Sequence, residues 1–139
     1  MEATAILQPV LVMALLTTAM MVWMYATRIP AMQVAGIQPN DARDHGALET
    51  LPAWARWPAD NYNHLFEQPT LFYAVCLAIA VAGHVDATHV ACAWVYTAAR
   101  IAHSLVQATV NVIMLRFAIF MLSWLALAVL VVREALAVF

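Results

Sequence analysis

The chemistry of this chain rests on a few ionisable residues that lie within long apolar stretches: Glu67, Arg100 and His103. Ionisable side chains are costly within a membrane-spanning segment, so such residues mark a functional site by default. A carboxylate at that depth needs a cation nearby, and Arg100 is the nearest candidate for Glu67. We therefore expect Glu67 and Arg100 to meet between helices, either in a binding site or as a buried ion pair that only fixes helix register.

Polar residues recur at helical spacing around these three. One apolar stretch carries a stripe at i, i+4, i+7 and i+11: Tyr96, Arg100, His103 and Gln107. The stretches before and after it carry similar stripes: Asn63, Glu67 and Thr70, and Arg116, Phe120 and Ser123. Three polar stripes on neighbouring helices can face one another and avoid lipid. The alternative is that His103 and Gln107 are hydrogen-bonded core residues and that Arg116 and Arg28 are interfacial anchors.

Four apolar stretches are long enough to cross a membrane as helices: residues 4–27, 64–83, 88–109 and 115–138. A spanning helix needs about 20 mostly apolar residues. Of the 139 residues, 65% are hydrophobic and only 10% are charged, which is far from the composition of a soluble domain. Tight turns at 83–87 and 110–114 join the last three stretches, so these helices run antiparallel. The sequence predicts one all-α membrane domain over residues 1–139, a four-transmembrane-helix antiparallel bundle. Pro69 predicts a bend in the second helix.

The longest connection, residues 28–61, is rich in Pro and Gly. Large apolar residues recur within it at helical spacing: Leu48, Leu51, Trp54 and Trp57. This pattern predicts a short helix in the headgroup layer with the two Trp as anchors. Basic residues gather on the same side of the membrane as this connection: Arg28, Arg43, Arg56 and Arg116. The positive-inside rule then places the connection in the cytoplasm and both termini outside, with Arg133 as the exception.

Composition excludes other classes of function. A net charge of -2, the absence of Lys and the lack of an Arg cluster exclude a nucleic-acid partner. Cys76 and Cys92 both fall in apolar stretches, which favours buried packing residues over a disulfide framework. The first apolar stretch is preceded only by Glu2 as a charge and is longer than the apolar core of a signal peptide, so we expect it to be retained.

Two strings in neighbouring stretches resemble one protein family. The strings are NYNHLFEQPTLFYA at 61–74 and ARIAHSLVQATVNVIMLRF at 99–117. Together they resemble the MAPEG family, the membrane-associated proteins of eicosanoid and glutathione metabolism. The resemblance is strong over residues 61–120, and the four stretches with a long first connection fit the rest. The chain is similar to the small bacterial members, which implies a bacterial inner-membrane location.

The resemblance implies a homotrimer of four-helix bundles that binds glutathione between subunits, near the cytoplasmic face. By position, Glu67 would contact the glutathione amino group and pair with Arg100, and His103 would line the same site. Arg116 would be the catalytic residue that stabilises the glutathione thiolate. Arg28 would contact a glutathione carboxylate.

Three positions depart from the family pattern. His64 stands where the family often has Asn, three residues before the glutamate, and Asn63 is displaced by about 100° around the helix. Gln107 and Phe120 stand where several catalytic members have tyrosines, so their missing hydroxyls bear on glutathione affinity and thiolate activation. We expect Asn63, His64 and Gln107 to line the glutathione site.

The function implied is a glutathione-dependent transferase or peroxidase acting on lipophilic electrophiles, with glutathione as co-substrate and the bilayer as the source of the second substrate. A guanidinium beside the sulfur would raise the fraction of thiolate at neutral pH. One alternative is a non-catalytic membrane scaffold, or subunit of a larger complex, that keeps the same fold. Another is a haem-binding electron carrier with His64 and His103 as axial ligands.

Overall fold

The computed structural model describes residues 1–43 and 46–139. It contains five α-helices: α1 Thr4–Ala35, α2 Ala53–His64, α3 Gln68–Ala82, α4 Ala87–Thr109 and α5 Ile113–Val138. Two short 3₁₀ segments, η1 Asp41–Arg43 and η2 Leu48–Thr50, lie between α1 and α2. These described residues contain no strand, and the all-α prediction is confirmed.

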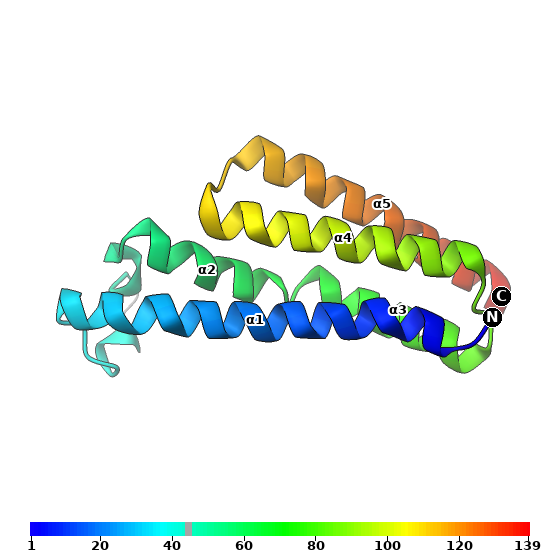
Figure 1. Ribbon diagram of the computed structural model, residues 1–139, viewed down its shortest axis with the longest axis horizontal. Coiled ribbons are helices and arrows are strands. Elements are labelled where there is room, and N and C mark those ends of the chain that lie inside the picture. Colours follow the sequence, from blue (N-terminus) through cyan, green and yellow to red (C-terminus); the bar gives the residue numbers. More distant parts are fainter. Residues whose placement is uncertain (44–45) are drawn as a thin grey trace.

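The helices form an elongated antiparallel bundle. α1 runs along the whole molecule, α2 and α3 return alongside it, and α4 and α5 form a hairpin packed on them (Figure 1). Both termini lie at one end, and the connection between α1 and α2 lies at the other (Figure 1). The predicted antiparallel bundle of four transmembrane segments is confirmed. α2 and α3 together form the second segment, which we call the second member of the bundle.

The second member is broken between α2 and α3, as Pro69 predicts. Pro69 lies in the first turn of α3, where an unbroken helix would bring its ring against the carbonyl four residues earlier, that of Leu65. At the break, Glu67 adopts φ −90° and ψ −100°, outside the helical region. The buried face nevertheless continues across the break, through Leu65 and Gln68.

The ends of the first two members differ from the sequence prediction. α1 continues beyond residue 27 to Ala35 and ends at Gly36, whose φ of 70° is a left-handed conformation that suits glycine. α2 begins at Ala53, so the non-helical connection is shorter than 28–61. Trp54 and Trp57 belong to α2, which lies along α1 (Figure 1). The structure therefore does not show a separate headgroup helix at these residues.

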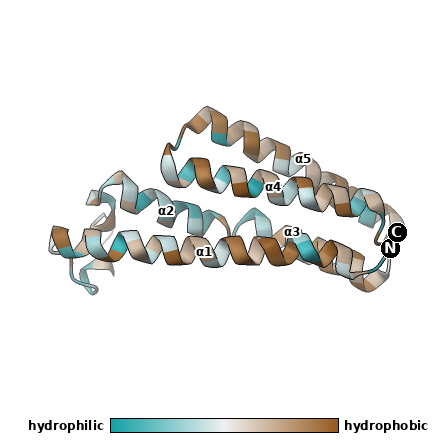
Figure 2. Cartoon of the chain, viewed as in Figure 1, coloured by the Kyte–Doolittle hydropathy of each residue, from teal (hydrophilic) through white to brown (hydrophobic). Residues whose placement is uncertain are grey.

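The outside of the bundle is apolar, as expected for contact with lipid. Three segments are long and apolar enough to cross a membrane: Thr4–Ala35, Ala53–Ala82 and Ile113–Val138. α4 has 23 residues, which is also sufficient length, but polar residues lower its hydropathy. Figure 2 shows the hydrophilic positions on α2 and α4 and the hydrophobic ones along α1 and α5. Length, composition and arrangement together describe an integral membrane protein.

Candidate functional site

A cavity of about 360 Å³ opens between α2, α4 and α5, towards the turn that joins α4 to α5. Six residues line it: His64, His103, Ile113, Arg116, Phe117 and Phe120. Three of these were predicted site residues, His64, His103 and Arg116, and the structure brings them together from three helices. The lining combines imidazole, guanidinium and aromatic groups, which suits a ligand with an anionic part and an apolar part.

Arg100 lies behind this cavity and is fully buried. Its guanidinium carbon is 5.6 Å from the centroid of the Phe120 ring, a cation–π contact with a residue that lines the cavity. Within the described part of the chain, all three side-chain nitrogens of Arg100 lack a hydrogen-bond partner. Buried charges in proteins are normally paired and hydrogen-bonded, so this unpartnered guanidinium marks a place for an anionic group.

The expected ion pair between Glu67 and Arg100 is wrong for this structure. Among residues 1–43 and 46–139, Glu67 contacts His64 instead, with 2.7 Å between Glu67 Oε2 and His64 Nδ1. The Glu67 side chain is 68% exposed, because it lies on the outer face together with Asn63 and Thr70. A helical projection groups these three residues correctly, but it does not tell which face of the helix meets the bundle.

His64 and His103 contact each other at the cavity wall. Their ring centroids are 5.3 Å apart, and both rings also contact Phe120. His103 is buried, and its Nδ1 has no partner among the described residues. The direct ring contact leaves no space for a porphyrin between the two imidazoles, so this geometry does not support the haem alternative.

Arg116 is oriented by the turn before α5. Its Nη1 donates a hydrogen bond to Asn111 Oδ1, while its Nε is buried without a partner in the described structure. Asn111 has φ 50°, a left-handed conformation that Asn tolerates better than most residues. Asn111 therefore both closes the turn and holds Arg116 at the cavity, a role that the sequence analysis missed.

The polar stripe predicted on the second member does not face the interior. Asn63 and Thr70 are exposed, like Glu67. Asn61 is instead fully buried, and neither its amide oxygen nor its amide nitrogen has a partner in the described residues. Asn61 was not singled out from the sequence. The signal that could have found it is its spacing from Leu65 and Gln68, at i, i+4 and i+7 on the buried face.

Gln68 connects α3 to α4 and α5 through side-chain hydrogen bonds. Its Oε1 accepts hydrogen bonds from Tyr96 Oη at 3.5 Å and from Ser123 Oγ at 3.1 Å. Tyr96 and Ser123 belong to predicted stripes on α4 and α5, and both are buried as predicted. Gln68 was missed because the predicted stripe was placed on the face that carries Asn63 and Glu67, which is exposed.

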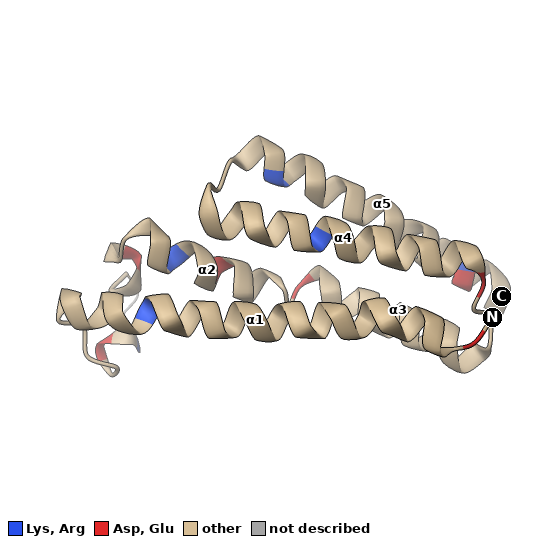
Figure 3. Cartoon of the chain, in the orientation of Figure 1, with Lys and Arg blue, Asp and Glu red and all other residues tan. Residues whose placement is uncertain are grey.

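The remaining predicted site residues, Arg28 and Gln107, do not line the cavity. Gln107 is buried on the inner face of α4, and its Oε1 has no partner among the described residues. Arg28 is half-buried on α1, and its Nε has no partner among the residues that the structure describes. Figure 3 shows basic positions on α1, α2 and α5 towards the α1–α2 connection and near the middle of α4, with acidic positions among them.

The opposite end of the bundle holds a separate polar network. Asp86 accepts a hydrogen bond from the His89 backbone N–H at 2.8 Å and caps α4. Arg133 donates to the Asp86 carboxylate, and His84 Nδ1 lies 3.2 Å from Glu134 Oε1. The hydrogen bond from His89, with the nearby His89 and Arg133 side chains, lowers the pKa of Asp86. Arg133 therefore has a local carboxylate partner.

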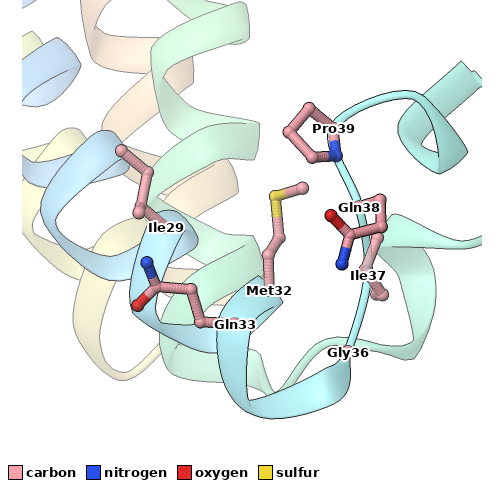
Figure 4. Close-up of a pocket in the computed structure, with 7 residues that line it drawn as sticks. All are labelled: Ile29, Met32, Gln33, Gly36, Ile37, Gln38 and Pro39. Atoms are coloured by element: carbon pink, nitrogen blue, oxygen red, sulfur yellow. The ribbon is translucent and has the colours of Figure 1, made fainter.

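A second cavity, of about 290 Å³, lies between the end of α1 and the connection that follows it. Figure 4 shows its lining: Ile29, Met32, Gln33, Gly36, Ile37, Gln38 and Pro39. Two neutral amides are the polar side chains in this lining. Such groups cannot act as acids, bases or nucleophiles, so the cavity beside Arg116 is the stronger candidate for chemistry.

Comparison with known proteins gives one match. A family model described as the MAPEG family matches residues 6–136, which include the cavity and Arg100. No curated protein and no solved structure matches the chain. The resemblance found in the sequence is confirmed.

Proposed function

The chain belongs to the MAPEG family, whose model matches nearly its whole length, and from this premise we propose that it is a glutathione-dependent transferase or peroxidase acting on lipophilic electrophiles. Family membership and the apolar helices establish a MAPEG-type integral membrane protein. Glutathione as co-substrate, the reaction and the homotrimer are our proposals.

The observation that carries this proposal is the pairing of a cavity with unpartnered guanidinium nitrogens. Arg116 lines the cavity and Arg100 lies behind it, and both retain buried nitrogens without partners in the described residues. Glutathione is an anionic tripeptide, and charge-assisted bonds to carboxylate or thiolate would satisfy such groups. Arg28 likewise has a buried Nε without a partner among the described residues, which would suit a glutathione carboxylate.

Arg116 is the residue that we assign to the sulfur. A guanidinium next to a thiol favours the thiolate, which is the nucleophilic form. The second substrate, the lipophilic electrophile, would bind at the apolar mouth of the cavity, where Phe117 is 57% exposed and Ile113 is 74% exposed. These side chains would admit a lipophilic electrophile directly from the bilayer.

We propose that a homotrimer completes the site. Asn63 and Glu67 lie exposed on the outside of the single chain, and a neighbouring copy placed there would bury them beside a bound tripeptide. Gln107 and His103 then belong to the interior wall on α4. We place the α1–α2 connection on the cytoplasmic side of a bacterial inner membrane, because Arg28, Arg43 and Arg56 lie in or near it.

The test is turnover of a chromogenic lipophilic electrophile by the detergent-purified protein with and without glutathione. We expect glutathione-dependent product, and a fall in kcat of about 10²-fold in Arg116→Ala, the size typical for loss of one group that stabilises developing charge. Arg133→Ala, at the other end of α5, is the matched control and should retain activity. Equal turnover in Arg116→Ala would remove Arg116 from the site, and a wild type without turnover would favour the non-catalytic scaffold or complex subunit.

A further inference from the structure

The contact between His64 and Glu67 fixes the proton on one imidazole nitrogen. His64 Nδ1 lies 2.7 Å from Glu67 Oε2, a charge-assisted distance. An ionised carboxylate can only accept, so Nδ1 must carry the hydrogen. In the neutral imidazole, the other nitrogen, Nε2, is then a free acceptor.

His64 presents this imidazole to the cavity. Its side chain is 21% exposed and lines the cavity with Arg116. Among the hydrogen bonds of the described residues, the only one made by the His64 ring is the Nδ1 contact with Glu67. Nε2 is therefore the acceptor left for a ligand held beside Arg116.

The other basic groups at the cavity are less suited to accept a proton. Arg116 and Arg100 are guanidinium groups that stay protonated, so they can stabilise an anion but not create it. His103 is buried and has no carboxylate partner among the described residues. The charged and titratable groups that face His64 are Glu67 beside it, Arg100 and His103 on α4, and Arg116 on α5. Of these, Glu67 is the one group that stabilises a positive imidazole.

We propose that His64, oriented by Glu67, is the base that takes the thiol proton of the substrate bound in this cavity. This inference rests on the proposed function. The S–H bond breaks as His64 Nε2 accepts the proton, and the electron pair stays on sulfur beside the Arg116 guanidinium. The imidazolium formed is offset by the Glu67 carboxylate, and His64 returns its proton to water or to the leaving group after the sulfur attacks the electrophile.

The decisive variant is His64→Asn, because an Asn amide N–H can still donate to Glu67 but has no nitrogen acceptor. Two properties are measured as a function of pH: the ultraviolet absorbance of the thiolate with glutathione present, and the glutathione-dependent rise in Tm. We expect the variant to keep the Tm rise. Its thiolate should form only at higher pH, and its turnover at neutral pH should fall by about 10²-fold or more, the usual contribution of a general base.

Glu67→Gln is the second variant, and it removes the charge while keeping an acceptor for Nδ1. It should shift thiolate formation in the same direction by a smaller amount. His84→Asn is the matched control, because it makes the same change in a His–carboxylate contact at the far end of the bundle, and its profile should equal that of the wild type.

The outcomes separate this inference from the proposed function. If either variant, His64→Asn or Glu67→Gln, binds glutathione and forms the thiolate at the same pH as the wild type, His64 is not the base. That result would leave the proposed function intact. A wild type whose Tm does not respond to glutathione would instead contradict the proposed function, and this inference would fall with it.

Discussion

At the scale of single residues, Arg100 is the most unusual feature of the molecule. It is fully buried, contacts the Phe120 ring, and has no hydrogen-bond partner among the described residues. A buried charge without a partner destabilises a fold, and function is the usual reason for its retention. The destabilisation of the fold by Arg100 should therefore be measurable in the ligand-free protein.

We predict that Arg100→Met raises the Tm of the ligand-free protein. Replacing buried ionic groups by apolar residues of similar volume is often stabilising, by about 1–4 kcal/mol, and Met fills irregular space well. Thermal unfolding in detergent measures the change. Arg133→Met is the comparison, because Arg133 has a carboxylate partner in Asp86, and this variant should gain no stability. A lower Tm for Arg100→Met would show that Arg100 supports the fold rather than a ligand.

At the scale of helices, α4 carries most of the buried polar side chains of the described residues and has a side-chain cap at its N-terminus. Asp86 caps α4 by accepting from the His89 backbone N–H, and its pKa is lowered from 3.8 by that hydrogen bond first and by His89 and Arg133 next. A carboxylate with a lowered pKa in the folded state stabilises the fold above the pKa of the unfolded chain, and this contribution disappears as pH falls through the folded value.

The prediction is that Asp86→Asn makes Tm less sensitive to acid. Asn also caps helices well, so the variant should keep its cap at neutral pH but lose the charge-dependent part. Tm measured from neutral pH to below 3.8 should fall less steeply in Asp86→Asn than in the wild type. Parallel curves for the two proteins would mean that the Asp86 charge contributes nothing to folding.

The helices also show which polar faces could be predicted from the sequence and which could not. The stripe on α4 was predicted correctly, because an unbroken amphipathic helix keeps its 3.6-residue period and its polar face must be buried in a membrane protein. Arg100, His103 and Gln107 are all on that buried face. The same reasoning failed on the second member because it chose the wrong face. Asn63, Glu67 and Thr70 share the exposed side, whereas Asn61, Leu65 and Gln68 share the buried one.

Contacts between distant segments could not be predicted from spacing alone. Asn111 reaches Arg116 because the turn adopts a left-handed conformation at Asn111, which no periodicity reveals. The His64–Glu67 contact is local in sequence, yet Glu67 was expected to meet Arg100, because the face that carries Glu67 was taken to be the inner one. The cavity depends on how α2, α4 and α5 pack, and that packing is a property of the whole fold.

At the scale of the whole molecule, basic residues are distributed unequally between the two ends. Basic positions on α1, α2 and α5 lie towards the α1–α2 connection (Figure 3), whereas the termini share the other end (Figure 1). The positive-inside rule counts Arg133 at the terminal end against Arg28, Arg43, Arg56 and Arg116 towards the other end. The proposed orientation follows from this distribution.

We predict that a phosphatase that folds only outside the inner membrane is active when fused after Phe139. The same enzyme inserted in the connection between α1 and α2 should be inactive, because the basic end stays in the cytoplasm. A fluorescent protein that folds only in the cytoplasm is the reciprocal reporter. The reverse pattern of signals would place the cavity on the outer face and rule out access to cytoplasmic glutathione.

The proposed function requires that the cavity beside Arg116 binds glutathione, and isothermal titration of the detergent-purified protein measures this directly. We expect binding by the wild type and by Arg133→Ala. Arg116→Ala should bind more weakly by about 10-fold to 100-fold, since a hydrogen bond to a charged group is worth about 1.5–3 kcal/mol. No binding by the wild type, or equal affinity in Arg116→Ala, would contradict the account.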